Sequence, residues 1–260
     1  MFKKAIVTVI VVLGLGVAAR EAFALEMLEN FLDKLNPGYE EGAIIGLGVR
    51  IAPQPYKDVD ARVMPVPIIN AQYKRLFIEG STVGVYLHTD EQCKLAIVGA
   101  PRFWGYESDD SNALVGMADR DWSFDAGLRG TLATEWFTGE LTFLGDISGE
   151  HNGQEVTFFV KRKFLDGGLT PRVGVKWLSN NLVDHYFGVE PNEARPGRPA
   201  YEADSTVNFV AGATLAVPLG EKWAWVTDGA VQVLSEEITD SPIVEDDAIL
   251  TFVTGLVYRY

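Results

Sequence analysis

The chain has 260 residues, a formal net charge of −14 at neutral pH and a single cysteine, Cys93. The acidic balance argues against nucleic acid and anionic lipid headgroups as partners, and one cysteine excludes an internal disulfide and a cysteine-based zinc site. Hydrophobic residues make up 47% of the chain, but no apolar run after residue 24 could cross a bilayer as a helix. The apolar residues must therefore lie in short segments.

The N-terminus has the pattern of a secretory signal peptide. Lys3 and Lys4 precede an apolar stretch of 15 residues over 5–19, and Ala22-Phe23-Ala24 is a small-residue cleavage site. A membrane-spanning helix needs about 20 apolar residues, so an uncleaved anchor is the less favoured alternative. We predict a signal peptide over 1–24 that is cut after Ala24.

The segment that follows has helical rather than strand periodicity. Leu28, Phe31, Leu32 and Leu35 recur at helical spacing with acidic residues between them. We therefore predict a short amphipathic helix in an N-terminal periplasmic segment over 25–40. This helix either caps the floor of the domain that follows or docks a periplasmic partner, and the first role is favoured.

From residue 41 onward the apolar residues alternate with polar ones. In 137–147, for example, Phe137, Leu141, Phe143 and Ile147 share one face, and threonines and acids occupy the other. A period of two indicates a β-strand. Eleven such segments fall at 43–52, 62–73, 75–88, 93–105, 121–134, 136–147, 155–165, 169–179, 204–217, 223–235 and 249–260.

These segments predict an all-β fold, an antiparallel transmembrane β-barrel over 41–260. Bacterial barrels have an even number of strands, so either 75–88 forms two short strands or one of the eleven assignments is wrong, and we predict about twelve strands, with ten as the fallback. A water-soluble sandwich or lipocalin-like barrel would show the same alternation with its apolar face turned inward. Strand lengths and tryptophans near the strand ends favour the membrane barrel.

The connections alternate between very short and long ones. The turns at 165–168 and 218–222 are tight, whereas 181–202 and 236–248 are long and polar. In outer-membrane barrels short turns face the periplasm and long loops face the exterior. We therefore predict a location in the outer membrane of a Gram-negative bacterium, with lipid and the barrel-assembly machinery as partners.

Catalytic groupings are scarce in this chain. Of the three histidines, His88 and His151 fall at predicted strand ends or loop tips, where solvated histidines are common, and His185 follows Asp184 a few residues after Ser179. Neighbouring residues of an extended chain point to opposite sides, so Asp184 does not obviously orient His185 for nucleophilic catalysis. We predict no enzyme activity, no catalytic residues, no metal ligands and no cofactor.

The predicted inner face of the barrel carries charges of both signs, and these charges allow two interpretations. A selective pore more often shows one sign at its constriction, so pairing into a salt-bridged plug is favoured. A narrow small-solute channel stays open as the alternative function. The residues are Arg50, Asp125, Arg129, Glu140, Asp146, Lys161, Lys163, Arg172, Lys176, Asp228 and Arg259.

Several stretches resemble the MipA/OmpV family of outer-membrane proteins. The most specific are the run 184–189, with Asp184, Tyr186, Phe187, Gly188 and Val189, and the run 197–203, with Arg198, Pro199 and Tyr201. The stretches 46–49, 63–67, 241–246 and 255–260 match as well. Two segments depart from the family pattern, namely 25–36 and the acidic loop 106–120.

The resemblance implies a non-catalytic barrel that scaffolds murein remodelling by holding a murein lytic transglycosylase near a murein synthase. The motif loop 181–202 faces outward in our topology, which fits a periplasmic partner poorly, so inward folding as a constriction is its alternative placement. On the last strand, we take the apolar face as a candidate barrel-assembly signal, formed by Phe252, Leu256, Tyr258 and Tyr260.

Overall fold

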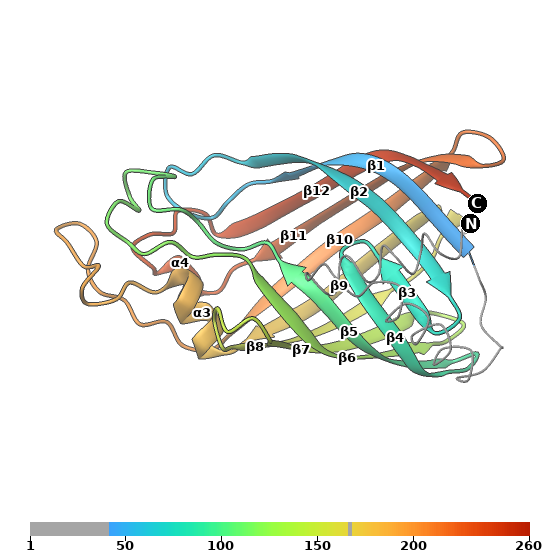
Figure 1. The fold of residues 1–260 in the computed structure, drawn as a ribbon, viewed down its shortest axis with the longest axis horizontal. Coiled ribbons are helices and arrows are strands. Elements are labelled where there is room, and N and C mark those ends of the chain that lie inside the picture. The colour runs from blue at the N-terminus through green and yellow to red at the C-terminus, as the bar shows by residue number, and fades with distance from the viewer. Residues whose placement is uncertain (1–41, 166–167) are drawn as a thin grey trace, which may run out of the picture.

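The computed structural model describes residues 42–165 and 168–260, which form a closed antiparallel barrel of twelve strands (Figure 1). Each strand pairs with its neighbours in the chain, and β1 closes the barrel against β12. The predicted signal peptide over 1–24 and the predicted helix in 25–40 fall outside the described residues. The strands are β1 (Gly42–Ala52), β2 (Arg62–Tyr73), β3 (Leu76–Glu79), β4 (Thr82–Thr89), β5 (Cys93–Arg102), β6 (Ser123–Ala133), β7 (Thr138–Asp146), β8 (Gln154–Lys161), β9 (Leu169–Leu178), β10 (Thr206–Pro218), β11 (Trp223–Val233) and β12 (Ala248–Arg259).

The strand count of twelve is confirmed, and of the two alternatives for 75–88 the one observed is the division into two short strands. The two are β3 and β4, which pair through a hairpin at Gly80, a residue with a positive φ of 61°. The fallback of ten strands is therefore not needed. No helix within the described ranges is both long and apolar enough to cross a membrane.

The apolar face of the strands lies on the outside of the barrel. Leu47 of β1 is 68% exposed and Phe209 of β10 is 66% exposed, although both belong to regular, paired strands. The side chains that alternate with the apolar ones along the strands point into the lumen, where Arg172 of β9 and Asp228 of β11, for example, pair with each other. A soluble sandwich would bury the first set, so the arrangement is that of a barrel surrounded by lipid.

The two ends of the barrel differ in their connections (Figure 1). At one end, called here the turn end, the strands are joined by short segments at 74–75, 90–92, 134–137, 162–168 and 219–222. At the other, the loop end, the connections are 53–61, 103–122, 147–153, 179–205 and 234–247. This alternation is the one predicted from the sequence.

The wall is interrupted in the half near the loop end, because β3 is too short to cover β2. Only 70–73 of β2 pair with β3, so 62–69 have no strand partner on that side. The Ile69 carbonyl accepts the Gly80 N–H there, and by alternation Pro67 and Pro65 face the same side. Proline has no N–H to leave unpaired, which suits it to such an edge.

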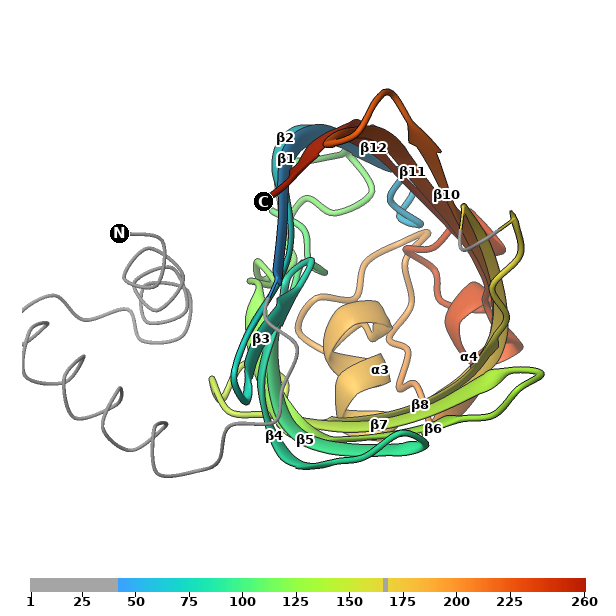
Figure 2. The ribbon, with the colours of Figure 1, turned by 90° about the vertical axis from the view of Figure 1, so that its right-hand side faces the viewer.

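Three of the long connections fold together across the loop end. They carry the helices α3 (Asn180–Phe187) and α4 (Glu236–Thr239), and α3 lies within the ring of strands when the barrel is viewed along its axis (Figure 2). We call the segments 103–122, 179–205 and 234–247 the loop plug. Together with flanking residues they form a buried core of Tyr56, Tyr106, Leu114, Met117, Leu178, Leu182, Val183, Tyr186, Phe187, Val189, Ala203, Leu234, Ile238, Ile243 and Val244.

Candidate functional site

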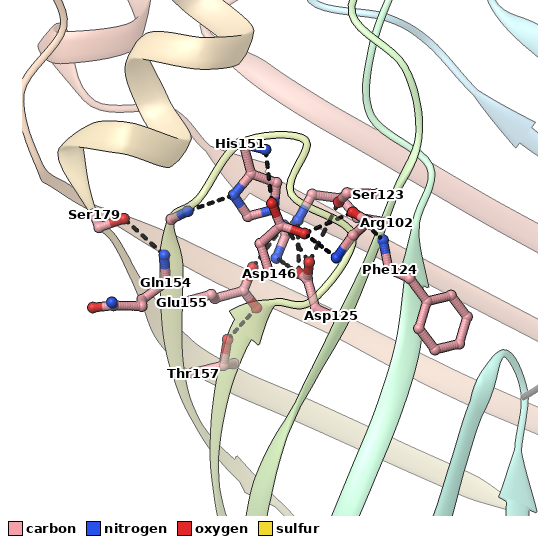
Figure 3. A network of polar contacts seen from close by, with 12 residues as sticks. Arg102, Ser123, Phe124, Asp125, Asp146, His151, Gln154, Glu155, Thr157 and Ser179 are labelled. Carbon is pink, nitrogen blue, oxygen red and sulfur yellow. Dashed lines mark hydrogen bonds and ion pairs between the residues drawn. The ribbon is translucent and has the colours of Figure 1, made fainter.

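A buried polar network lies inside the barrel directly beneath the loop plug (Figure 3). Arg102 bridges two carboxylates, with 2.5 Å from Nη2 to Asp125 Oδ2 and 2.9 Å from Nη1 to Glu155 Oε2. Lys176 Nζ lies 3.5 Å from Glu155 Oε1, and His151 Nε2 lies 3.1 Å from Asp125 Oδ1. Two cations, Arg102 and Lys176, thus face two carboxylates, Asp125 and Glu155, so the formal charges of these four side chains balance.

The network is built by strands that are distant in sequence. Arg102 is the last residue of β5, Asp125 and Glu155 lie near the starts of β6 and β8, and Lys176 lies near the end of β9. All four belong to the inward-facing set of their strands, so the period of two places them in the lumen. Because the charges are taken out of water, each of them needs its partners to remain stable there.

Asp125, Asp146 and His151 bring potential metal ligands within 4.8 Å of one another. Their ligand atoms are already engaged, however. His151 Nδ1 accepts the Gly153 N–H while Nε2 faces Asp125, which also binds Arg102. The Asp146 carboxylate accepts backbone N–H groups of the connection 147–153, including that of His151. Backbone donors, the imidazole and a guanidinium therefore fill the positions that a cation would need.

The motif residues of the loop 181–202 hold the loop plug together. Arg198 is buried and donates to the carbonyls of Ala113, Val115 and Glu193, which ties 179–205 to the loop after β5. Arg120 makes a second tie, with Nη2 lying 3.3 Å from Glu193 Oε1.

The remaining motif residues lie in or beside α3. Asp184 accepts the Ala203 N–H at Oδ1, and its carbonyl accepts the Gly188 N–H. Tyr186 and Phe187 are fully buried, and Val189 pairs with Tyr201 across a short bridge. Pro199 is exposed. Of the two placements considered for this loop, the inward one is observed, with its apolar residues inside the plug.

The grouping around His185 does not assemble into a catalytic set. Ser179 Oγ accepts the Gln154 N–H, the Asp184 carboxylate is engaged with Ala203, and His185 Nε2 lies 3.2 Å from Glu150 Oε1. Each of the three side chains thus has a different partner. Burial, together with the nearby Arg120 guanidinium, lowers the pKa of His185 below 6.5.

The expectation that His151 is solvated was wrong. Its side chain is fully buried between Asp125 and α3, and its ring lies 5.8 Å from that of Tyr186. The connection 147–153 turns inward because Asp146 accepts several of its backbone N–H groups, an interaction that the strand pattern does not reveal. Burial also raises the pKa of Tyr186 to about 12. His88, by contrast, is exposed as expected.

Several of the other lumenal charges pair as the favoured interpretation predicts, whereas Arg50 contacts a ring instead and Lys163 and Arg259 are exposed. Near the turn end, Arg129 binds Glu79 at 2.7 Å and Lys161 binds Glu140 at 2.9 Å. Arg172 binds Asp228 through both terminal nitrogens, at 2.7 and 2.8 Å. Arg102 and Glu155 were not among the predicted lumenal charges, although the inward register of β5 and β8 could have indicated both.

The candidate assembly residues of β12 lie on its outer face or at its end. Phe252 is exposed, and Tyr258 packs edge-on against Trp223 and Tyr260, each with 5.0 Å between ring centroids. This places an aromatic cluster at the turn end of the barrel, where rings suit the boundary between lipid and water.

The chain is similar to known outer-membrane proteins. The MltA-interacting protein of Escherichia coli K12 is 29% identical over 221 residues, which cover 83% of this chain and 89% of that protein. Outer membrane protein OmpV of Vibrio cholerae is 30% identical over 142 residues, which cover 54% of this chain and 55% of that protein.

Solved barrels are more distant. The toluene transporter TbuX of Ralstonia pickettii aligns with a TM-score of 0.41 at 9% identity, covering 85% of this chain and 90% of that one. A family model described as MltA-interacting protein MipA matches residues 45–260, which is nearly the whole barrel. The chain therefore belongs to the MipA family of outer-membrane barrel proteins.

Proposed function

We propose that this protein is a non-catalytic scaffold of the outer membrane that holds a murein lytic transglycosylase, together with a murein synthase, close to the murein layer. The observation that carries the proposal is the similarity over 89% of the length of a relative named for its interaction with MltA. Two contacts among the described residues support it, because Ser179 Oγ accepts the Gln154 N–H and His151 Nε2 faces Asp125, so neither side chain is placed to act with the other.

The turn end, which is predicted to face the periplasm, supplies a contact surface. Trp136 is 67% exposed and Leu165 is 76% exposed. The Arg162 guanidinium lies 5.8 Å from the ring of Trp136 and 5.1 Å from that of Phe164, so two neighbouring turns present one aromatic and cationic surface. Exposed aromatic and arginine side chains are typical of protein interfaces.

The test is capture of a purified murein lytic transglycosylase by the refolded barrel in detergent, with an unrelated barrel of similar size as the control. We expect specific binding that falls at least tenfold in a Trp136→Ala, Arg162→Ala double variant, because interface aromatic and arginine residues often carry much of the binding energy. Deleting 25–36 tests whether that segment contributes. Equal capture by both barrels would refute the scaffold function.

A narrow small-solute channel is the second candidate function, supported by a cavity of about 320 Å³ inside the lumen. The loop plug covers this cavity at the loop end, so conduction would require the plug to move. Single-channel recording in a planar bilayer decides this function: discrete conductance steps support it, and a silent, correctly folded barrel rejects it.

For folding into the membrane, we infer that the barrel-assembly machinery recognises the outer face of β12. Replacing Phe252 and Tyr258 by alanine should lower the amount of folded barrel in the membrane without changing the stability of the purified, refolded protein by a similar degree. Equal membrane levels of variant and wild type would contradict this role.

A further inference from the structure

The cavity inside the lumen has the features of a ligand site, independently of any scaffold function. It lies between the strand wall and the underside of the loop plug, and its volume of about 320 Å³ falls within the range of small-molecule sites. Arg50 of β1, Trp104 of the first plug segment and Phe187 of α3 approach it from three directions.

Its cations differ in how they are neutralised. Arg172 is held by Asp228 in a two-point contact, and Lys176 by Glu155. Arg50 forms no ion pair with any carboxylate of the described residues, and its guanidinium instead lies 5.8 Å from the ring of Phe103. The cavity therefore carries one positive charge that its own walls do not neutralise.

A second donor in the cavity is also unsatisfied. Gln232 of β11 lines it and is only 9% exposed, yet its Nε2 atom has no hydrogen-bond partner in the structure. A buried amide donor without an acceptor costs free energy, so its persistence needs an explanation. A bound molecule that carries acceptor oxygens supplies one.

The rest of the lining is largely aromatic. Phe103, Trp104, Phe159 and Phe187 all contribute to the wall, with Val210 among the aliphatic residues. Such a surface gains free energy by covering an apolar body, and ring faces suit a planar one. The cavity thus combines one free positive charge with an aromatic enclosure.

We propose that this cavity binds a small aromatic monocarboxylate, whose carboxylate pairs with Arg50 while its ring packs among Trp104, Phe103 and Phe187. Gln232 offers a further hydrogen bond to the bound molecule. A neutral aromatic of the same size gains only the apolar contacts. A dianion is disfavoured, because the remaining cations already have carboxylate partners.

The experiment is calorimetric titration of the refolded barrel in nanodiscs with 2-naphthoate and with its neutral counterpart 2-naphthylmethanol. We expect the acid to bind at least tenfold more tightly, since a charge-assisted contact is worth more than a neutral one. An Arg50→Gln variant should lose that advantage and bind both probes equally. The matched control is Arg259→Gln, which removes an arginine near the turn end, outside this cavity.

Three results would each overturn the proposal: no binding of 2-naphthoate by the folded wild type, equal affinity for the acid and the alcohol, or full retention of acid binding in Arg50→Gln. Folding of every variant is checked by its heat-sensitive mobility on a gel. If Arg50→Gln does not fold, Gln232→Glu takes its place, since an added carboxylate should repel the acid and spare the alcohol. Transglycosylase capture is scored separately, so failure of either proposal leaves the other intact.

Discussion

At the turn end, connections as short as 74–75 join the strands, and side chains such as Trp136 and Leu165 are exposed. At the loop end, three long connections bury fifteen apolar residues with their flanks and lie over a network that joins four strands. The loop end therefore has a packed core of the kind found inside soluble domains, while the described part of the barrel outside it buries only a smaller cluster of Phe77, Tyr86, Ala96 and Val98.

The difference between the two ends shows which part of this membrane barrel depends on side-chain packing. The outer face of the wall is solvated by lipid, so apolar residues there gain little by meeting one another. Inside the loop end, charged side chains and apolar rings are both removed from solvent, so the stability of each side chain depends on its specific neighbours. Substitutions at the loop end should accordingly cost much more than matched substitutions at the turn end.

The largest effect is expected for Arg102→Met. The change leaves Asp125 and Glu155 buried with fewer partners, which should lower the unfolding free energy by about 3 kcal/mol. Urea unfolding in detergent, followed by tryptophan fluorescence, measures it. Arg259→Met at the turn end is the control and should change stability by less than about 0.5 kcal/mol. Similar losses of unfolding free energy in both variants would contradict the expected difference between the two ends.

Leu182→Ala should have the next largest effect. This α3 residue is fully buried, so the cavity left behind should cost about 2 kcal/mol of local stability in the loop plug. We expect faster proteolysis within 179–205 while the strands stay protected. Leu219→Ala, in an exposed turn, serves as the matched variant and should leave proteolysis unchanged. Unaltered cleavage in Leu182→Ala would show that the plug is not held by its core.

A pH effect confined to the loop end should follow from His185. Its pKa is lowered in the folded protein by burial and by Arg120, so the unfolded chain binds more protons. The contribution of the neutral imidazole is complete above the unfolded value of 6.5 and is lost as the pH falls below it. The protection factors of the plug amides, which correct for the intrinsic pH dependence of exchange, should therefore fall between about pH 7.5 and about pH 5.5, and less so in His185→Gln. An identical pH response in that variant would assign the effect to another group.

The smallest effect is expected at the interruption of the wall. Pro67 faces the side of β2 that lacks a strand partner, so Pro67→Thr should change the unfolding free energy by less than about 0.5 kcal/mol. Its neighbour Val66 faces β1, and Val66→Pro removes a ladder hydrogen bond and should cost at least about 1 kcal/mol. Equal costs for the two substitutions would mean that the edge is paired in the membrane.

The sequence alone determined the barrel. A period of two is a local property, because successive side chains of a strand point to opposite faces whatever the strand pairs with. That property located the strands and separated the lipid-facing Phe209 from lumenal residues such as Arg172, and the even strand number of bacterial barrels then pointed to about twelve strands. The alternation of short and long connections likewise predicted that one end of the barrel has tight turns and the other has long loops.

Only the tertiary structure decided how the lumen is filled. The partners Arg102 and Glu155 are 53 positions apart, and their meeting depends on the registers of the intervening strands. The inward folding of α3 and the burial of His151 depend on contacts between loops that no local pattern encodes. Pairing and packing of this kind are long-range, so the period of two could indicate which side chains enter the lumen but not which of them meet there.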